Sequence, residues 1–237
     1  MPMNGIGLRL WPAGKQPSRR KLTLLVTGAL LALFVAASGK AGAQEVGAQS
    51  ALSSAGESAP AVLFNEDSSS QGQEYAGSVK WRIDRIKEAG RADEIVVHAD
   101  IEIPGKMKMK LDFERNADQS LPASHIVKLT FSIPQDVAGG QVMSVPGLLM
   151  KFSERGQAVP LAARTAKITG GVFLIGLSNV GPDRERNLQL LKERQWIDVA
   201  MVYGNQHRGI LAIEKGYHGG VVFNEAMAAW SGLGERL

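Results

Sequence analysis

The stretch 100-DIEIPGKMKMKLDFER-115 decides the fold class, because charged and apolar residues alternate strictly from Lys106 to Glu114. Successive side chains of a β-strand point to opposite faces, so this pattern is typical of a strand with one face in a core and one in water. Methionines two residues apart on such a face are ordinary packing residues, and we do not interpret them as metal ligands. The apolar face comprises Met107, Met109, Leu111 and Phe113.

The same stretch predicts a β-hairpin. Ile103 and Met107 both belong to the apolar face, and Pro104, Gly105 and Lys106 between them can form a three-residue loop. Directly opposed residues in a sheet share a face. The expected register therefore pairs Ile103 with Met107, Ile101 with Met109, Ala99 with Leu111 and Val97 with Phe113.

Lys106, Lys108 and Lys110 lie on the opposite face of this strand, which leaves two interpretations. In the first, they pair with Asp100 and Glu102 of the neighbouring strand, as in ordinary cross-strand charge pairing. In the second, they form a face that contacts an anion or a partner protein. These three lysines are the candidate binding residues of the sequence.

The rest of the chain continues the β pattern. Two helices are predicted: 182–194, where a proline opens the first turn, and 221–230, which has one apolar face. A turn at Pro146-Gly147 is expected before the strand in 142–152. The fold class is mainly β: an antiparallel β-sandwich-like domain of about eight strands with two short helices, preceded by one N-terminal apolar helix. Strands other than 106–114 are predicted at 75–85, 94–103, 125–133, 142–152, 171–177, 195–203 and 208–215.

The segment 22-LTLLVTGALLALFVAASG-39 contains 18 residues without a charge, and five basic residues precede it. Its length is at the lower end of what spans a bilayer, and the positive flank keeps the preceding end cytoplasmic. We expect residues 1–21 to be a basic cytoplasmic tail and 22–39 to be a signal anchor in the inner membrane. The small residues 41-AGA-43 leave open a signal peptide cleaved after residue 43, which would release a secreted or soluble periplasmic protein.

Residues 44–61 are rich in Ser, Ala and Gly and predict a flexible linker, so the globular domain is expected at 62–237, in the periplasm. The net charge of +4 belongs to the N-terminal segment, because residues 1–43 contain six basic residues and no acidic one. The remainder has 21 basic and 23 acidic residues, without the basic surplus of a nucleic-acid-binding domain. The sequence has no cysteine, which excludes disulfides, thiolate catalysis and iron–sulfur clusters.

The sequence contains no recognisable catalytic constellation. Its four histidines, His98, His125, His207 and His218, include no two at metal-ligand spacing. His98 is expected to face outward among acidic residues and His125 to open a strand, each as a surface or hydrogen-bonding residue. No catalytic residue, metal or cofactor is predicted, and the chain is not expected to be an enzyme.

Several strings between residues 61 and 230 resemble those of a family of uncharacterised proteins from rhizobial and related alphaproteobacteria. The resemblance implies an N-terminal apolar segment, a variable linker and this domain, in a membrane-anchored or exported protein. It implies no functional residue, because the family has no established activity. The strings are WRID, IEIPGKMKMKLDFERN, LPASH, GLLMKF, FLIGLS, NLQLLKERQWIDVAMVYGN and RGILAIEKG.

These observations lead to a functional expectation. The leading hypothesis is a non-enzymatic, envelope-facing interaction or scaffold domain tethered to the inner membrane, with an envelope protein as partner. The alternative is a periplasmic ligand-binding module that uses the face of Lys106, Lys108 and Lys110 or a cleft between sheets. A deep cleft with converging polar groups and a shifted pKa would favour the alternative.

Overall fold

The computed structural model describes residues 58–66, 72–86, 94–137 and 139–232. The basic tail, the apolar segment 22–39, the cleavage site after residue 43 and residues 44–57 of the expected linker lie outside the described residues. The first described strand begins at Ser58, inside the segment 44–61. Neither described helix is long and apolar enough to cross a bilayer.

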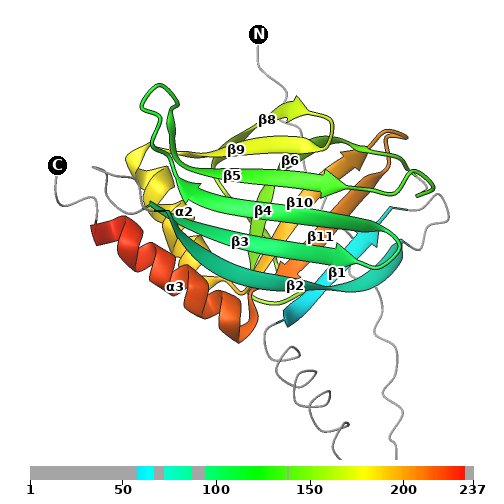
Figure 1. Ribbon diagram of the computed structural model, residues 1–237, viewed down its shortest axis with the longest axis horizontal. Coiled ribbons are helices and arrows are strands. Elements are labelled where there is room, and N and C mark those ends of the chain that lie inside the picture. The colour runs from blue at the N-terminus through cyan, green and yellow to red at the C-terminus, as the bar shows by residue number, and fades with distance from the viewer. Residues whose placement is uncertain (1–57, 67–71, 87–93, 138, 233–237) are drawn as a thin grey trace, which may run out of the picture. The chain divides into compact units, whose positions relative to one another are not determined.

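The described strands form one antiparallel sheet of eleven, in the order β7-β6-β10-β11-β1-β2-β3-β4-β5-β9-β8 (Figure 1). Two helices follow late in the chain, α2 Gly181–Glu193 and α3 Gly216–Gly232. The strands are β1 Ser58–Asn65, β2 Gln73–Ile86, β3 Glu94–Ile103, β4 Met107–Arg115, β5 Ala123–Ser132, β6 Val142–Lys151, β7 Val159–Pro160, β8 Ala163–Thr169, β9 Val172–Ser178, β10 Trp196–Tyr203 and β11 Arg208–Glu214.

The hairpin predicted from the quoted stretch is confirmed in its register and its faces. Ile103 opposes Met107 and Ile101 opposes Met109, and the pairing continues through Ala99 and Leu111 to the end of the strands. Met107 and Met109 are 3% and 1% exposed, whereas Lys108 and Lys110 face solvent. The alternation of the sequence therefore identified the core face of β4.

The expected number of strands, about eight, is wrong, because β1, β7 and β8 were not predicted. β8 is an edge strand with mostly exposed side chains, so it lacks the apolar alternation that reveals a half-buried strand. β7 has two residues. In β1 small residues such as Ala59 and Ala61 occupy the buried positions, and they resemble the composition of a linker.

The turn expected at Pro146-Gly147 is also wrong, because β6 runs through both residues. The pairing between β6 and β10 is irregular around this point, between Ala200 and Val202 of β10. The neighbouring β7 pairs with β6 at Leu149 and Met150, beyond the proline. A proline is tolerated in a strand at a bulge or an unpaired edge, where no ladder hydrogen bond requires its missing N–H.

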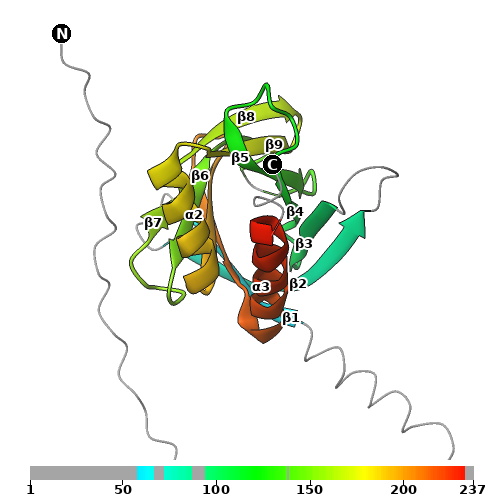
Figure 2. The ribbon, with the colours of Figure 1, turned by 90° about the vertical axis from the view of Figure 1, so that its left-hand side faces the viewer.

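The expected sandwich-like arrangement is not what forms: the strands belong to a single sheet that curls into a half-barrel (Figure 2). The inner faces of the strands share one apolar core, so opposite parts of the same sheet replace two separate sheets. The two edge regions approach each other, since Lys167 Nζ of β8 lies 3.4 Å from the carbonyl oxygens of Val142 and Met143 in β6. Figure 2 shows α2 and α3 across the end of this curl.

The predicted apolar face of the last helix is confirmed as the face that docks on the sheet. Phe223 packs edge-on against Trp81 of β2 and Phe113 of β4, with ring centroids 5.3 and 5.8 Å away. Trp230 is buried and its indole nitrogen donates to the carbonyl oxygen of Ile95 at 3.2 Å. These contacts hold α3 against the inner face of the sheet, next to the site described below.

Candidate functional site

Lys108 and Lys110 lie on the outer face of β4, whereas Lys106 lies in the turn before this strand, so the three candidate lysines have different surroundings. Lys108 Nζ is 3.1 Å from a carboxylate oxygen of Glu102, which is the expected cross-strand pair. Lys106 Nζ lies 4.3 Å from the centroid of the Tyr75 ring. Lys110 stands opposite Asp100, but that carboxylate pairs with an arginine of β2. Neither cavity described below is lined by these lysines.

His98 faces the outer side of the sheet among acidic residues, as predicted. Its Nδ1 lies 2.7 Å from Asp112 Oδ1 and its Nε2 lies 3.1 Å from Asp84 Oδ2. Both ring nitrogens therefore have a carboxylate partner. We interpret this group as a network that joins β2, β3 and β4, because it leaves no imidazole nitrogen for a ligand.

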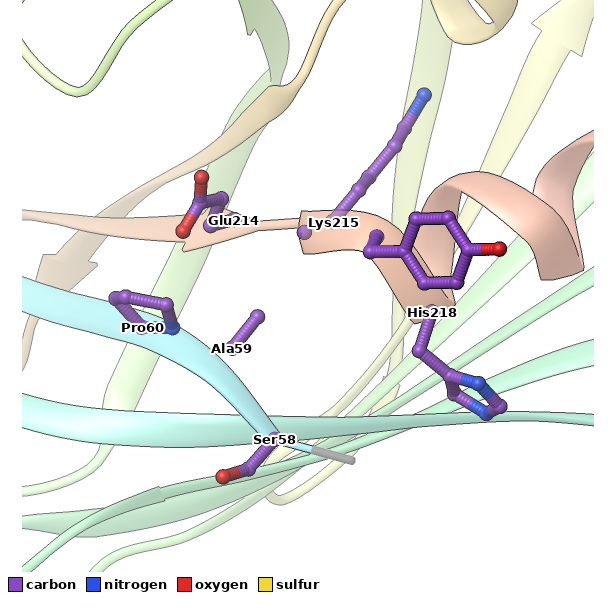
Figure 3. A pocket seen from close by; sticks show the side chains of 8 residues that line it. Ser58, Ala59, Pro60, Glu214, Lys215 and His218 are labelled. Atoms are coloured by element: carbon purple, nitrogen blue, oxygen red, sulfur yellow. The ribbon is translucent and has the colours of Figure 1, made fainter. Parts of the chain in front are cut away.

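A first cavity, of about 170 Å³, lies at the start of α3 beside β1 and the end of β11 (Figure 3). Lys215 contributes to its lining, but Figure 3 shows that its side chain extends away from Ser58 and Pro60. Its ammonium group donates to the carbonyl oxygen of Leu191 and lies 4.3 Å from the ring centroid of Phe223. Burial lowers the pKa of Lys215 to about 7. The amine has its partners inside the protein and is not directed at a ligand in this cavity.

A second cavity, of about 270 Å³, is lined by residues of α2, of the end of α3 and of the adjoining ends of β4, β5 and β9. We call it the arginine pocket. Leu188, Met227 and Trp230 supply its apolar wall. The polar residues of its lining are Arg115, Asn116, Ser124, His125, Asn179, Arg184 and Ser231.

His125 is the most deeply buried polar residue of the arginine pocket. It continues the inner face of β5 formed by Val127 and Leu129, and it is 3% exposed. Its ring packs edge-on against Trp230, with the centroids 4.8 Å apart. Nδ1 lies 3.2 Å from the Ser124 hydroxyl oxygen, whereas Nε2 has no hydrogen-bond partner among the described residues. A buried polar atom without a partner costs about 1–3 kcal/mol, so the burial of His125 lowers the stability of the domain.

Arg115 at the end of β4 and Arg184 in α2 bring positive charge to the pocket. Burial first, and then the charges of Arg184 and Arg115, lower the pKa of His125 to about 4, so the imidazole is neutral at pH 7. Within the described part of the chain, no carboxylate lies at ion-pair distance from either guanidinium. The lining also contains no Asp or Glu. The two positive charges are therefore not neutralised by the described residues around the pocket.

Other polar groups of the lining maintain the wall itself. The side-chain amide nitrogen of Asn116 donates to the carbonyl oxygens of Asp118 and Leu121 in the loop that precedes β5, and to that of Ala123 at the start of β5. The hydroxyl of Ser231 lies 2.9 Å from the carbonyl oxygen of Met227 within α3. The groups left for a ligand are the two guanidiniums and the amide of Asn179. A guanidinium presents several N–H donors in a plane that matches a carboxylate or a phosphate, so this set favours a small anion.

The sequence analysis missed this site. Of the two roles predicted for His125 at the start of a strand, the surface residue is wrong because His125 is buried, and the hydrogen-bonding residue agrees with the 3.2 Å distance from its Nδ1 to the Ser124 hydroxyl oxygen. The available signal was the alternation itself, since His125 shares the odd positions of Val127, Leu129 and Phe131. The arginines gave no local signal, because Arg115 belongs to β4 and Arg184 to α2, and they line one cavity only in the folded domain.

No protein-family model, no curated protein and no solved structure matches this chain. The resemblance to an alphaproteobacterial family remains a prediction from the sequence. The function is therefore inferred from the geometry of the pocket.

Proposed function

We propose that the domain is a binding module for a small organic anion, which it holds in the arginine pocket. The sequence offered a ligand-binding module as its alternative hypothesis. The proposed site differs from the lysine face named there, because it lies at the end of the sheet that the helices cover. The observation that carries it is that one cavity is lined by the guanidiniums of Arg115 and Arg184, and no described carboxylate lies at ion-pair distance from either.

The electrostatics of the pocket support this proposal. Two like charges beside a buried neutral imidazole repel each other, and an anion would relieve that repulsion while accepting hydrogen bonds from both guanidiniums. The cavity of about 270 Å³ lies just below the roughly 300–1,000 Å³ typical of sites for drug-sized molecules, which favours a ligand of few atoms.

The binding proposal is tested by titrating the full-length protein with small carboxylates and inorganic phosphate in a calorimeter. Arg184→Gln is expected to weaken binding of the tightest anion by about tenfold or more, because it removes a charged hydrogen bond. Arg186→Gln is the matched control: it makes the same charge change on the same helix, and Arg186 does not line the pocket. Equal effects of the two substitutions would refute the site.

We also propose that the module works on the outer side of the inner membrane. The support is the uncharged segment 22–39 with its preceding basic residues. Anchoring by this segment or release after residue 43 would leave the domain in the periplasm, where it would meet small anions before they reach the cytoplasm.

A further inference from the structure

The side chains that line the arginine pocket include a charged group and an apolar group. The guanidiniums of Arg115 and Arg184 carry positive charge, and the lining contains no Asp or Glu. Leu188 of α2 and Met227 of α3 contribute apolar surface to the same cavity. A ligand that fills the cavity therefore meets two kinds of surface.

The charged and apolar groups are arranged in order along α2. Arg184 and Leu188 are four residues apart, so they lie on the same face of the helix, one turn from each other. Arg184 is exposed, whereas Leu188 and Met227 are half-buried. Trp230, the third apolar residue of the lining, is 4% exposed. The charge thus lies toward solvent and the apolar surface toward the interior of the domain.

The part of α3 that lines the pocket has no free side-chain donor among the described residues. The indole nitrogen of Trp230 donates to the carbonyl oxygen of Ile95. The hydroxyl of Ser231 lies 2.9 Å from the carbonyl oxygen of Met227 and 3.0 Å from that of Ala228, so its proton is used within the helix. Met227 has no donor in its side chain. A charged group of a ligand placed against this wall would lose hydration without gaining a side-chain hydrogen bond.

We propose that the arginine pocket binds monocarboxylates with a short apolar chain, with the carboxylate at the two guanidiniums and the chain between Leu188 and Met227. This inference rests on the proposed binding function and names the class of its ligand. Such a molecule is charged at one end and apolar at the other, as the pocket is.

Other small anions match only part of this lining. Inorganic phosphate can accept hydrogen bonds from the guanidiniums, but it has no group to cover Leu188 and Met227. A dicarboxylate of the same chain length places its second charge against the apolar wall, unless each of its carboxylates takes one arginine. The comparison of a monocarboxylate with a dicarboxylate therefore decides between the two arrangements.

The test is a calorimetric titration of the full-length protein with acetate, propanoate, butanoate and pentanoate at constant ionic strength. Affinity should rise by about twofold to fourfold for each added methylene group that the pocket buries. The heat capacity change of binding should become more negative along the series, which is the signature of apolar burial. Butanoate should bind about tenfold or more tightly than succinate, which has the same four-carbon chain with a second carboxylate. Inorganic phosphate is a further arm and should bind more weakly than pentanoate.

Two substitutions separate the apolar wall from the charges. Met227→Gln retains the length of the side chain and places an amide on the wall, so the ratio of pentanoate to acetate affinity should fall about fivefold. Arg184→Gln should weaken every member of the series by a similar factor and keep this ratio. Met143→Gln is the control for Met227→Gln, because Met143 is 50% exposed and does not line the pocket. Leu188→Gln on α2 replaces Met227→Gln if that variant does not fold.

The possible outcomes distinguish this inference from the proposed function. Binding that depends on Arg184 but not on chain length would overturn the inference and leave the anion site in place. Succinate binding more tightly than butanoate would also overturn it, and so would a chain-length dependence that survives both Met227→Gln and Leu188→Gln. No binding of any of these anions at millimolar concentration would overturn both proposals.

Discussion

His125 is a polar residue on the core face of β5, and its surroundings change its ionisation. The backbone places it inward with Val127 and Leu129, where α3 covers it with Trp230. Because it is buried beside two arginines, it stays neutral, and its pKa falls to about 4. The same burial costs stability, because Nε2 of His125 has no hydrogen-bond partner among the described residues.

This pKa predicts a pH dependence of stability. Above pH 6.5 the imidazole is neutral in the folded and the unfolded chain, so it contributes no difference. Between pH 6.5 and about 4 the unfolded chain binds a proton that the folded protein excludes, so the free energy of unfolding falls as the pH falls, by about 3 kcal/mol in total from this residue. Urea unfolding from pH 7 to pH 4 should show this loss in the parent protein, and His125→Leu should lack that part of it. Parallel pH profiles for the two proteins would contradict the assignment.

A second prediction at the residue scale concerns the two faces of β4. Met109→Lys should lower the free energy of unfolding by about 4 kcal/mol or more, because it places a charge at a position that is 1% exposed. Lys108→Met should change it by less than about 1 kcal/mol, since the ion pair that it removes is largely exposed. Chemical denaturation of both variants measures the difference. If both substitutions were equally tolerated, the assignment of the faces would be wrong.

At the scale of elements, the end of α3 forms one wall of the arginine pocket, because Met227 and Trp230 belong to the lining. Its beginning is fixed by close packing on β2. A Cβ atom added to Gly219 would lie 2.7 Å from the indole ring of Trp81, which is shorter than any normal contact. The helix can therefore approach the sheet this closely because position 219 has no side chain.

The glycines of α3 allow a matched test of this packing. Gly219→Ala should destabilise the domain by about 1–3 kcal/mol, because the methyl group forces Trp81 or the helix to shift. Gly220→Ala places the same methyl group where no atom lies within 4 Å. It should stabilise the domain by about 0.5–1 kcal/mol through helix propensity. Thermal unfolding of the two variants distinguishes them, and a shift in the same direction for both would contradict the packing argument.

At the scale of the whole molecule, β1 joins the two parts of the sheet. It pairs with β2 on one side and with β11 on the other, so the first described strand connects β2–β5 with the group of β6, β10 and β11. A segment next to the predicted linker therefore lies in the middle of the sheet. Any fusion or truncation of the leader has to leave residues 58–65 intact.

The proposed location is tested with two reporters fused to the C-terminus. Alkaline phosphatase is active outside the cytoplasm, and a fluorescent protein that matures in the cytosol serves as the matched control. We expect activity from the phosphatase fusion and no fluorescence from the other, because the basic flank of 22–39 stays inside. Mass spectrometry of the membrane and soluble fractions then distinguishes an intact anchor from a form that begins at Gln44. Fluorescence without phosphatase activity would contradict the proposed periplasmic location.

The sequence by itself determined the class of the fold, the faces of β2 to β5, the register of the β3–β4 hairpin and the two helices. It could do so because side-chain alternation and helical periodicity are local properties, repeated every two or about 3.6 residues. Met109 and Lys108 could be assigned to opposite faces without any knowledge of distant residues.

The tertiary structure alone decided that the strands form a single curled sheet, that the small residues of β1 lie in its middle, and that Arg115, His125 and Arg184 line one cavity. These features depend on strand order and on contacts between residues far apart in the chain, which no local period encodes. The physical reason is that the ionisation and the hydrogen bonds of a buried polar residue such as His125 depend on the groups around it. Those surroundings come from α2, α3 and β9, which the chain reaches after β5.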